Sequence, residues 1–560
     1  MGESGEKEAK DCPGRLVEGM IGSSSPMKTA ARRASLALIL LLPPLTAAWA
    51  HRSEMTFLWW IVPGSVFLAL LMLGPWYLLF GSAPVRRRWL RVSSTAVGIV
   101  SVGYILSLLV RYEGSGSGSS YPVFAWTWEE RRNPPPAPSA SASLAAPTPT
   151  LIPSDAVADV VDFLGPDRDG MWEHPLFATD WNEAPPRLLW KRPIGKGWSS
   201  FTVARGHALT QQQIGDDEHI TSLDLATGQD RWSHADPQTR LLLERTENGG
   251  AAMGGDGPRA TPVVHGNRVY TMGSTGVVNC LELETGRLVW SRHLLRDLGS
   301  IAHRWGMANS PLILTNPPLV VFAGPEKPGP TLVACDLDTG ETRWVSKGGG
   351  ASYSSPRLVT LGGVEQIVSV NYTDLSGLDP ETGRVLWSHP WPLEFPKVGQ
   401  PLLLSGDRLL VTASYGAGSL LLAVKRAPSG VFSVERIWKT TSLKTKFSTA
   451  AIIGNHAYGL DEGRLACIGL ADGKRVWKKD KFGFGQHLLF GEWLLVQTEP
   501  GEVVIGKLGP EGFAESGRIP ALSSMTWNIP TVAGRLLLVR NDREASAWLL
   551  PDLPEAAPGR

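Results

Sequence analysis

One short pattern recurs along the chain and constrains its fold more than any other feature. Five segments end in a Gly that is followed, four residues later, by a Trp, and most of them read Asp or Glu, two variable residues, Thr and Gly. A degenerate copy ends at Trp438, and a lone Trp stands at position 190. Successive Trp residues in this series lie between 39 and 58 residues apart. The Gly–Trp pairs are Gly228 and Trp232, Gly286 and Trp290, Gly340 and Trp344, Gly383 and Trp387, and Gly473 and Trp477.

A repeat of this length, rich in short alternating strands, is typical of β-propeller blades. Within each copy the Thr-Gly step predicts a tight turn, because Gly tolerates a positive φ. The following strand then places its Trp between neighbouring blades, where burying about 200 Å² of indole contributes roughly 5 kcal/mol before entropy is counted. We therefore assign a structural packing role to the repeated residues Trp190, Trp232, Trp290, Trp344, Trp387, Trp438 and Trp477.

The two ends of the repeat region indicate how many blades there are. The segment from Thr526 to Leu550 supplies three strands before the chain runs out, whereas Leu188 to Arg192 is a strand without a blade of its own. Pairing the two would close the ring and remove two exposed sheet edges. Seven further blades fit between them, the last ending near Arg518. We predict an all-β, eight-bladed propeller, with seven blades as the alternative.

Three segments ahead of the repeats carry no charged side chain, namely residues 34–50, 55–80 and 92–110. A helix needs roughly 20 apolar residues to cross the hydrocarbon layer, so we predict three transmembrane helices. Lys28, Arg32 and Arg33 precede the first span, and Arg86 to Arg91 lie between the second and the third. By the positive-inside rule, the N-terminus and that second loop are cytoplasmic, and everything after the third span lies across the membrane.

An alternative remains for the first span. Met27, the basic residues after it and the Ala48-Trp49-Ala50 sequence resemble a cleavable signal peptide, in which case Met27 rather than Met1 is the start. Both readings place the repeats outside the cytoplasm. The predicted organisation is a cytoplasmic segment 1–33, a transmembrane region 34–111, a Gly/Ser/Pro/Ala-rich linker 112–158 that behaves as a flexible tether, the propeller 159–552 and a tail 553–560.

The repeats resemble the pyrroloquinoline-quinone-like (PQQ-like) repeat, which builds eight-bladed propellers in quinoprotein dehydrogenases and in BamB-like outer-membrane assembly factors. Phe163 to Gly170 is similar to the opening of large bacterial PQQ-like repeat proteins, and Trp305 to Pro311 fits a Trp-Gly-x-x-x-Ser-Pro stretch of the same group. The resemblance covers about residues 160–552, and it implies a fold more than a chemistry.

The resemblance also implies what an enzyme of this fold would need. A quinoprotein dehydrogenase stacks its cofactor between a Trp and a disulfide of adjacent cysteines, binds calcium through Glu and Asn, and uses Asp as a base. Cys280, Cys335 and Cys467 lie in equivalent strands of different repeats and read as buried small hydrophobes. The eight stretches that should lead into the innermost strands contain no Asp or Glu. We therefore expect no cofactor, no metal and no catalytic residue, with PQQ and calcium only under an alternative.

What remains at the predicted axis is a polar, mildly basic funnel. Converging cations favour an anionic group, and aromatic rings offer flat contact area for an extended peptide. The alternative is a set of solvated loop charges around a structural channel, and both stay open. The predicted funnel consists of Arg259, Arg304, Trp305, Tyr353, Lys397, Lys446, His487 and Trp527, with Trp198 nearby.

The charge balance excludes one class of partner. Lys and Arg number 54 against 53 Asp and Glu, for a net charge of +1, whereas general nucleic-acid binding needs a strongly basic face. Two functions remain. The first is a non-catalytic binding scaffold with protein or peptide partners, anchored in a bacterial inner membrane with its propeller in the periplasm. The second is a divergent membrane-bound quinoprotein-type alcohol or sugar dehydrogenase.

Overall fold

A computed structural model describes residues 26–53, 61–115, 122–128, 152–153, 156–240, 255–326, 329–393 and 395–553. The chain divides into two compact units, a helical one and a β-sheet one. The predicted segment before residue 26, the Pro/Ala/Ser tract from 133 to 150 and the tail after 553 lie outside the described residues.

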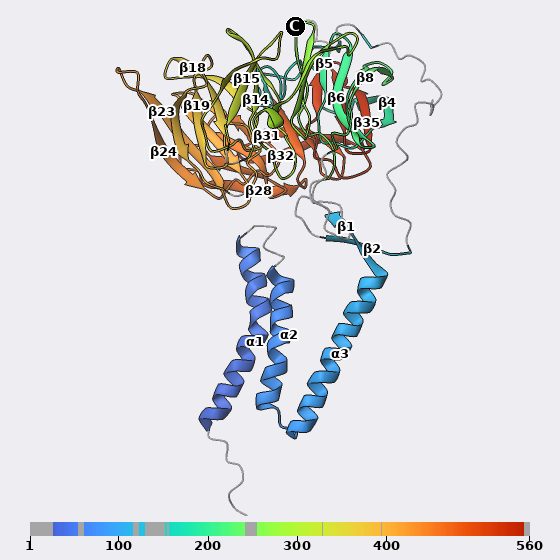
Figure 1. Cartoon of the computed structure of the whole chain (residues 1–560), viewed down its shortest axis with the longest axis vertical. Coiled ribbons are helices and arrows are strands. Elements are labelled where there is room, and N and C mark those ends of the chain that lie inside the picture. The colour runs from blue at the N-terminus through green and yellow to red at the C-terminus, as the bar shows by residue number, and fades with distance from the viewer. Residues whose placement is uncertain are drawn as a thin grey trace, which may run out of the picture. The chain divides into compact units, whose positions relative to one another are not determined.

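The helical unit consists of α1 (Pro26–Ser53), α2 (Ile61–Phe80) and α3 (Val85–Leu109), drawn as three coiled ribbons in Figure 1. All three are long and apolar enough to cross a membrane. They leave large apolar side chains uncovered, since Leu38, Leu79 and Val100 are each at least 70% exposed. A large exposed apolar surface of this kind fits lipid better than water.

Polar side chains join the first two helices. Thr46 Oγ1 of α1 lies 2.8 Å from Ser65 Oγ of α2, and Trp76 Nε1 donates to Ser35 Oγ at 2.9 Å. The first helix continues through Pro43 and Pro44, so the predicted short span is a full one. The third helix starts earlier than predicted, at Val85, because Pro84 stands just ahead of it and Arg is a good helix former.

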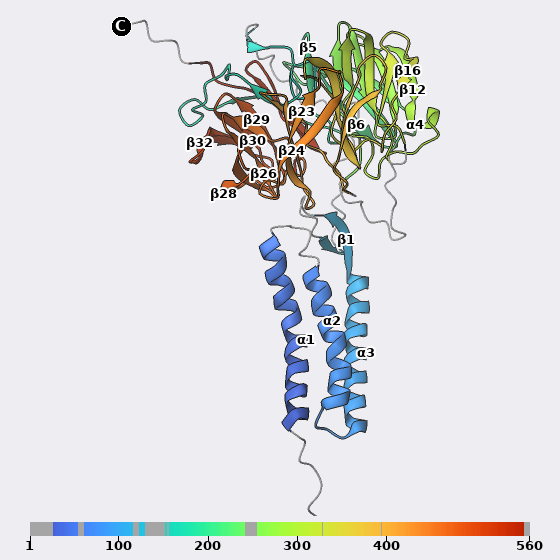
Figure 2. The same cartoon turned by 90° about the vertical axis from the view of Figure 1, so that its left-hand side faces the viewer.

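A short hairpin of β1 (Val110–Ser115) and β2 (Pro122–Trp126) follows within the range predicted as linker. The described remainder forms the propeller, whose sheets lie side by side in Figures 1 and 2. This part of the chain contains eight sheets, and each has four antiparallel strands ordered from the axis outward. The prediction of eight blades is confirmed.

The first four blades follow one another directly. Blade 1 contains β5 (Thr202–Ala204), β6 (His207–Ile214), β7 (Asp217–Asp224) and β8 (Asp230–Asp236); blade 2 contains β9 (Val263–His265), β10 (Arg268–Met272), β11 (Val277–Glu282) and β12 (Leu288–His293), followed by the short helix α4 (Leu294–Asp297); blade 3 contains β13 (Leu312–Thr315), β14 (Pro318–Ala323), β15 (Leu332–Asp336) and β16 (Thr342–Val345); blade 4 contains β17 (Arg357–Leu361), β18 (Val364–Val370), β19 (Asp374–Leu378) and β20 (Val385–Pro390).

The last four blades continue this order, and two of them borrow a strand from the start of the chain. Blade 5 contains β21 (Leu402–Leu404), β22 (Arg408–Ala413), β23 (Gly418–Arg426) and β24 (Phe432–Thr440); blade 6 contains β25 (Ala451–Ile453), β26 (His456–Asp461), β27 (Arg464–Gly469) and β28 (Arg475–Lys481); blade 7 contains β3 (Met171–Trp172), β29 (Gln486–Phe490), β30 (Trp493–Gln497), β31 (Val503–Gly509) and β32 (Gly512–Ile519); blade 8 contains β33 (Thr531–Ala533), β34 (Leu536–Arg540), β35 (Glu544–Leu549) and β4 (Arg187–Pro193).

The ring closes where the sequence predicts. Strand β4 pairs antiparallel with β35, from Arg187 opposite Leu549 to Pro193 opposite Glu544. Trp190 of β4 then reaches forward into blade 1, where its Nε1 donates to Leu225 O at 2.8 Å. One strand from before blade 1 therefore completes blade 8 and links it to blade 1.

A segment from Ala156 to Trp172, the axial segment, covers one end of the propeller axis. Val160 forms an antiparallel bridge with Val203 at the free edge of β5, and β3 pairs parallel with β29 on blade 7. The two ends of the segment lie where inner strands finish, since Arg535 N, after β33, donates to Ala156 O and Gly491 N, after β29, donates to Trp172 O.

Two buried ion pairs fix the middle of the axial segment. Arg168 is 3% exposed, pairs with Asp162, and donates to the carbonyls of Ser310 at 3.0 Å and Pro311 at 2.9 Å. The next residue, Asp169, accepts from Arg357 of blade 4 at 2.8 Å. Consecutive residues thus contact blades 3 and 4, and β3 joins blade 7, so the segment crosses the axis. The Asp167 to Gly170 stretch is part of this crossing.

Candidate functional site: the axial mouth

The opposite end of the axis, where the eight inner strands begin, is called the axial mouth here. It is lined by the loops that lead into the inner strands and by the hairpins between the second and third strands of each blade. Trp527, ahead of blade 8, lies 4.8 Å from the ring of Trp198 and 5.0 Å from that of Phe447, measured between centroids. Phe447 precedes blade 6, which is not a neighbour of blade 8. These rings therefore meet at the axis.

Lys446 lies within this group of aromatic rings. Its Nζ is 4.7 Å from the centroid of Tyr415, 4.8 Å from Phe484 and 5.8 Å from Phe447. The three rings come from blade 5, from the loop ahead of blade 7 and from the loop ahead of blade 6. Lys446 is only 3% exposed, and burial lowers its pKa against the effect of nearby carboxylates. The ammonium group is therefore held inside an aromatic enclosure.

Three buried glutamates lie close to the cations of the mouth. The carboxylates of Glu462 and Glu499 attract the ammonium group of Lys446, and that of Glu218 attracts the guanidinium of Arg259. All three are less than 10% exposed. Sequence reasoning missed them because it searched only the loops that lead into the inner strands. Glu462 and Glu499 belong to hairpins on the same end of the blades, and Glu218 is the second residue of β7, next to such a hairpin. The Glu462-Gly463 and Glu499-Pro-Gly501 turns were the available signal.

Two of the predicted funnel residues donate hydrogen bonds to the surrounding loops, and a third is buried. Arg259 donates from both terminal nitrogens to the carbonyls of Gly257 at 2.7 Å and Gly255 at 2.8 Å. Lys397 is fully buried, and its Nζ donates to Asn371 O at 2.5 Å and Tyr372 O at 2.7 Å. His487 is 93% buried, its ring nitrogens contact no hydrogen-bonding group among the described residues, and burial lowers its pKa to about 4.

The remaining predicted residues form a second group on the side of blades 3 and 4. Arg304 is exposed, and its guanidinium lies 5.0 Å from the ring centroid of Trp305. Trp305 in turn lies 6.1 Å from Tyr353, whose hydroxyl accepts from the Trp305 backbone N–H at 3.0 Å. Burial raises the pKa of Tyr353 to about 12. Of the predicted cations, Arg304 is the one that faces solvent in the described structure.

The repeated Trp residues lie between blades. Those that precede a Thr-Gly or Asp-Gly turn donate to a carbonyl of that turn in the next blade, and a Cβ on the turn Gly would clash with the indole. Thus Trp232 Nε1 donates to Leu283 O at 2.8 Å, and a Cβ on Gly286, whose φ is +67°, would lie 2.4 Å from the Trp232 ring. The same donation joins Trp190 to Leu225, Trp290 to Leu337, Trp344 to Pro380 and Trp438 to Leu470.

Two members of the series differ because the next blade lacks the turn. Blades 5 and 7 have no Thr-Gly or Asp-Gly turn between their third and fourth strands. Trp387 therefore donates to Gln366 within its own blade at 2.5 Å, and Trp477 Nε1 has no acceptor among the described residues. The Gly and the Trp of the repeat are thus two halves of one contact between blades.

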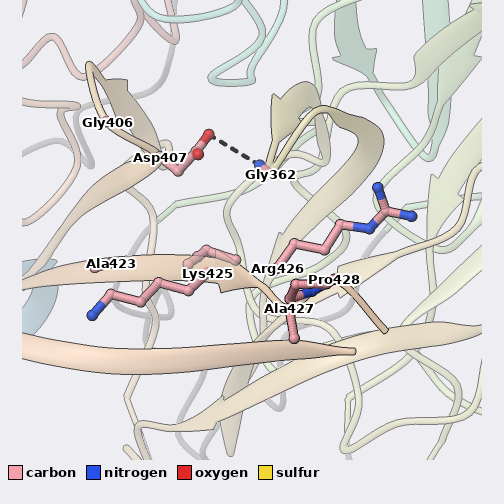
Figure 3. A pocket seen from close by; sticks show the side chains of 9 residues that line it. Gly362, Gly406, Asp407, Ala423, Lys425, Arg426, Ala427 and Pro428 are labelled. Carbon is pink, nitrogen blue, oxygen red and sulfur yellow. Dashed lines mark hydrogen bonds between the residues drawn. The ribbon is translucent and has the colours of Figure 1, made fainter. Parts of the chain in front are cut away.

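A hollow of about 520 Å³ lies away from the mouth, between blades 4 and 5. It is bounded by the turns at Gly362 and Asp407, where Asp407 accepts from the Gly362 N–H at 3.0 Å (Figure 3). Lys425 and Arg426 extend from it in opposite directions. These turns follow the inner strands, so the hollow is on the far end of the blades. It is separate from the predicted site.

The mouth differs from the PQQ and calcium site that the resemblance implies. The rings of Trp198 and Trp527 are tilted by 36° and contact each other, and the parallel rings of Phe395 and Tyr415 stack directly on each other, so neither pair has room for a flat quinone between its faces. Cys280, Cys335 and Cys467 are buried free thiols in separate blades, as expected. In the ranges that the structure describes, no three His, Cys, Asp or Glu side chains gather as a metal site.

Part of the chain is similar in sequence to known proteins. A family model described as outer membrane protein assembly factor BamB matches residues 216–479. The outer membrane protein assembly factor BamB of Alteromonas naphthalenivorans is 27% identical over 242 residues, which are 40% of this chain and 55% of that protein. The match therefore spans about half the length of the curated relative.

Two solved structures align with this chain at 12–13% identity. BamB from Moraxella catarrhalis superposes with a TM-score of 0.45 and 13% identity over 65% of this chain and 100% of that one. A quinohemoprotein alcohol dehydrogenase from Comamonas testosteroni gives a TM-score of 0.48 and 12% identity over 75% of this chain and 83% of that one. Residues 216–479 are thus similar to the BamB family, and the described chain folds as an eight-bladed β-propeller.

Proposed function

We propose that this protein is a membrane-anchored, non-catalytic binding scaffold of the bacterial envelope, whose axial mouth receives an extended segment of a partner protein. The observation that carries the proposal is the group of aromatic rings that non-neighbouring blades bring together at the mouth. Aromatic rings give large contact area at low entropic cost. The axial segment supports a one-sided site, because its ends lie at the far end of the axis and its middle crosses the axis below the mouth.

The location is part of the proposal. Three apolar helices suit a membrane, and the arginines between α2 and α3 favour a cytoplasmic loop there. This orientation would place the propeller in the periplasm of an inner-membrane protein. The similar BamB protein carries the name of an outer membrane assembly factor, which supports protein partners in the envelope for this chain as well.

The test selects peptides that bind the full-length protein in detergent and then measures their affinity for mouth variants. Phe395 is 39% exposed and stacks on Tyr415 at 4.8 Å, and Trp305 is half-buried beside Arg304. We expect Phe395→Ala and Trp305→Ala to weaken binding about tenfold or more, as loss of an interface anchor does. Phe432→Ala on β24, away from the mouth, is the matched control and should leave the affinity unchanged.

Charge is tested at Arg304, because it faces solvent while Arg259 is held by its own loop. If the partner segment is anionic, Arg304→Glu should weaken its binding and make the remaining binding less salt-dependent. Peptides that bind both aromatic variants as well as the unaltered protein would place the site elsewhere and end the proposal.

We also propose that the protein acts without a redox cofactor. The alternative, a divergent quinoprotein-type dehydrogenase, requires PQQ and calcium to bind and to support dye reduction with an alcohol or sugar. We expect neither a bound-quinone absorbance nor dye reduction after both are added to the full-length protein. Cofactor-dependent reduction of the dye would favour the dehydrogenase.

A further inference from the structure

The floor of the axial mouth has the composition of a receptor for an ammonium group. Three aromatic faces from three different loops surround the Lys446 Nζ within 6 Å. Ring faces carry negative potential, and such enclosures recognise ammonium ligands, most strongly when water is excluded. Glu462 and Glu499 add two carboxylates that act on the same ammonium group. The enclosure is thus built for one positive charge.

Groups besides Lys446 also hold the carboxylates in place. Glu462 Oε1 accepts from Ser414 Oγ at 2.5 Å. Glu499 accepts from Trp527 Nε1 at 2.9 Å and from the Phe484 backbone N–H at 3.2 Å. Because these donors come from the hairpins and loops themselves, the carboxylates keep their places when the lysine side chain leaves. The site is therefore preorganised for a cation of another origin.

The enclosure is reachable from solvent at its rim. Tyr415 and Phe447 are partly exposed, whereas Phe484 at the back is 5% exposed. A rotation of the four-carbon lysine stem toward the mouth would vacate the enclosure without moving the backbone. A group that arrives through the mouth meets Tyr415 and Phe447 first.

We propose that Tyr415, Phe447, Phe484, Glu462 and Glu499 form an ammonium-binding cage, which Lys446 occupies in the resting protein and which a lysine side chain or free amino terminus of a partner takes over. The identity of the partner rests on the proposed function, but the cage itself does not. Lys446 then acts as an internal competitor, so that only a correctly placed amine, held by further contacts at the mouth, displaces it.

The first experiment removes the internal occupant. Full-length Lys446→Ala is prepared in detergent, and its thermal unfolding is followed with increasing methylammonium chloride, against sodium chloride at equal ionic strength. A ligand that binds only the folded state raises the unfolding temperature with concentration. We expect a rise of several degrees for Lys446→Ala with methylammonium, at least threefold larger than for the unaltered protein.

Matched variants separate the cage from a general effect of charge. Lys425→Ala removes an exposed lysine paired with Glu435 and should show no response to methylammonium beyond that of sodium chloride. Adding Glu462→Gln and Glu499→Gln to Lys446→Ala should abolish the response. An equal response in all variants, or no response in folded Lys446→Ala, overturns the proposal.

A second measurement uses the unaltered protein, in case Lys446→Ala does not fold. Acetylation of Lys446 is followed by mass spectrometry with and without tetramethylammonium, which does not consume the reagent. Displacement of Lys446 should speed its acetylation about threefold relative to Lys425, and an unchanged ratio counts against the cage. Methylammonium binding without any peptide ligand would retain the cage and end the proposed function, whereas peptide binding without an ammonium response would do the reverse.

Discussion

Five of the seven repeated Trp residues donate to a backbone carbonyl of the next blade. Trp190 Nε1 reaches Leu225 O across the seam that closes the ring, whereas Trp477 Nε1 finds no acceptor among the described residues. Both indoles are more than 90% buried. The two positions therefore differ mainly in one hydrogen bond, which makes them a matched pair.

Replacing these residues with Phe should separate packing from hydrogen bonding. Both variants lose similar apolar area, but Trp190→Phe also leaves the buried Leu225 carbonyl without its donor. An unsatisfied buried group costs about 1 kcal/mol or more, so Trp190→Phe should be more destabilising than Trp477→Phe by about that amount. Denaturant unfolding of both variants measures the difference, and equal losses would mean that the indole N–H contributes nothing.

Glu218 predicts a pH dependence at the same scale. Burial raises its pKa to about 7, against the hydrogen bonds from Ser274. The folded state therefore holds a proton that the unfolded state releases near pH 4.5, and the free energy of unfolding falls as pH rises from about 4.5 to 7. Glu218→Gln should lose less stability than the unaltered protein between pH 5 and pH 8.

The comparison of the two proteins at each pH isolates Glu218 from other groups. His303 and His487, whose pKa values burial lowers to about 4, act in the opposite direction over the same range and are common to both proteins. Parallel stability curves, measured by denaturant unfolding, would show that Glu218 is ionised in the fold.

At the scale of elements, the axial segment contrasts with the strands around it. The strands could be predicted because most repeats contain a local turn sequence and a Trp at a fixed spacing. The closure of the ring could be predicted because the first and last segments each lack a complete blade. Arg168 could not, because its partners Ser310 and Pro311 lie more than 140 residues away and carry no local pattern. Glu462 and Glu499 were missed for a related reason, since a turn acid becomes a mouth residue only once the blades form a ring.

The axial segment predicts a large loss of stability from one substitution of a buried side chain. Arg168→Ala would leave the Asp162 carboxylate without its cation and the carbonyls of Ser310 and Pro311 without this donor, and breaking a buried pair typically costs about 3–5 kcal/mol. The control Arg287→Ala breaks an exposed pair with Glu282 and should change little. Denaturant unfolding compares them, and Asp162→Asn combined with Arg168→Met should recover part of the loss. Equal stability of the two single variants would mean that the axial segment is not docked.

At the scale of the whole molecule, the helices and the propeller are two units with different surfaces. The helices expose leucines and valines, while the propeller buries them between its sheets. The apolar runs and basic loops of the sequence were sufficient to predict three helices. The helix α3 starts seven residues before the predicted span, because its first turns contain arginines, which a search for uncharged segments excludes.

The proposed orientation predicts the behaviour of fusion proteins. Alkaline phosphatase, which is active only outside the cytoplasm, should be active when fused after Asp552 and inactive when fused after Pro84, between α2 and α3. Green fluorescent protein should give the reverse pattern. Measuring both reporters at both sites checks the topology, and phosphatase activity after Pro84 would invert it.

The strand that completes blade 8 is synthesised before blade 1, whereas its partner β35 follows blade 7. Until Glu544 to Leu549 has been synthesised, β4 has no neighbour to pair with and Trp190 has no completed seam. The ring thus cannot close before its eighth blade has been made, so a chain shortened ahead of β35 would stay open and present its unpaired strand to proteases.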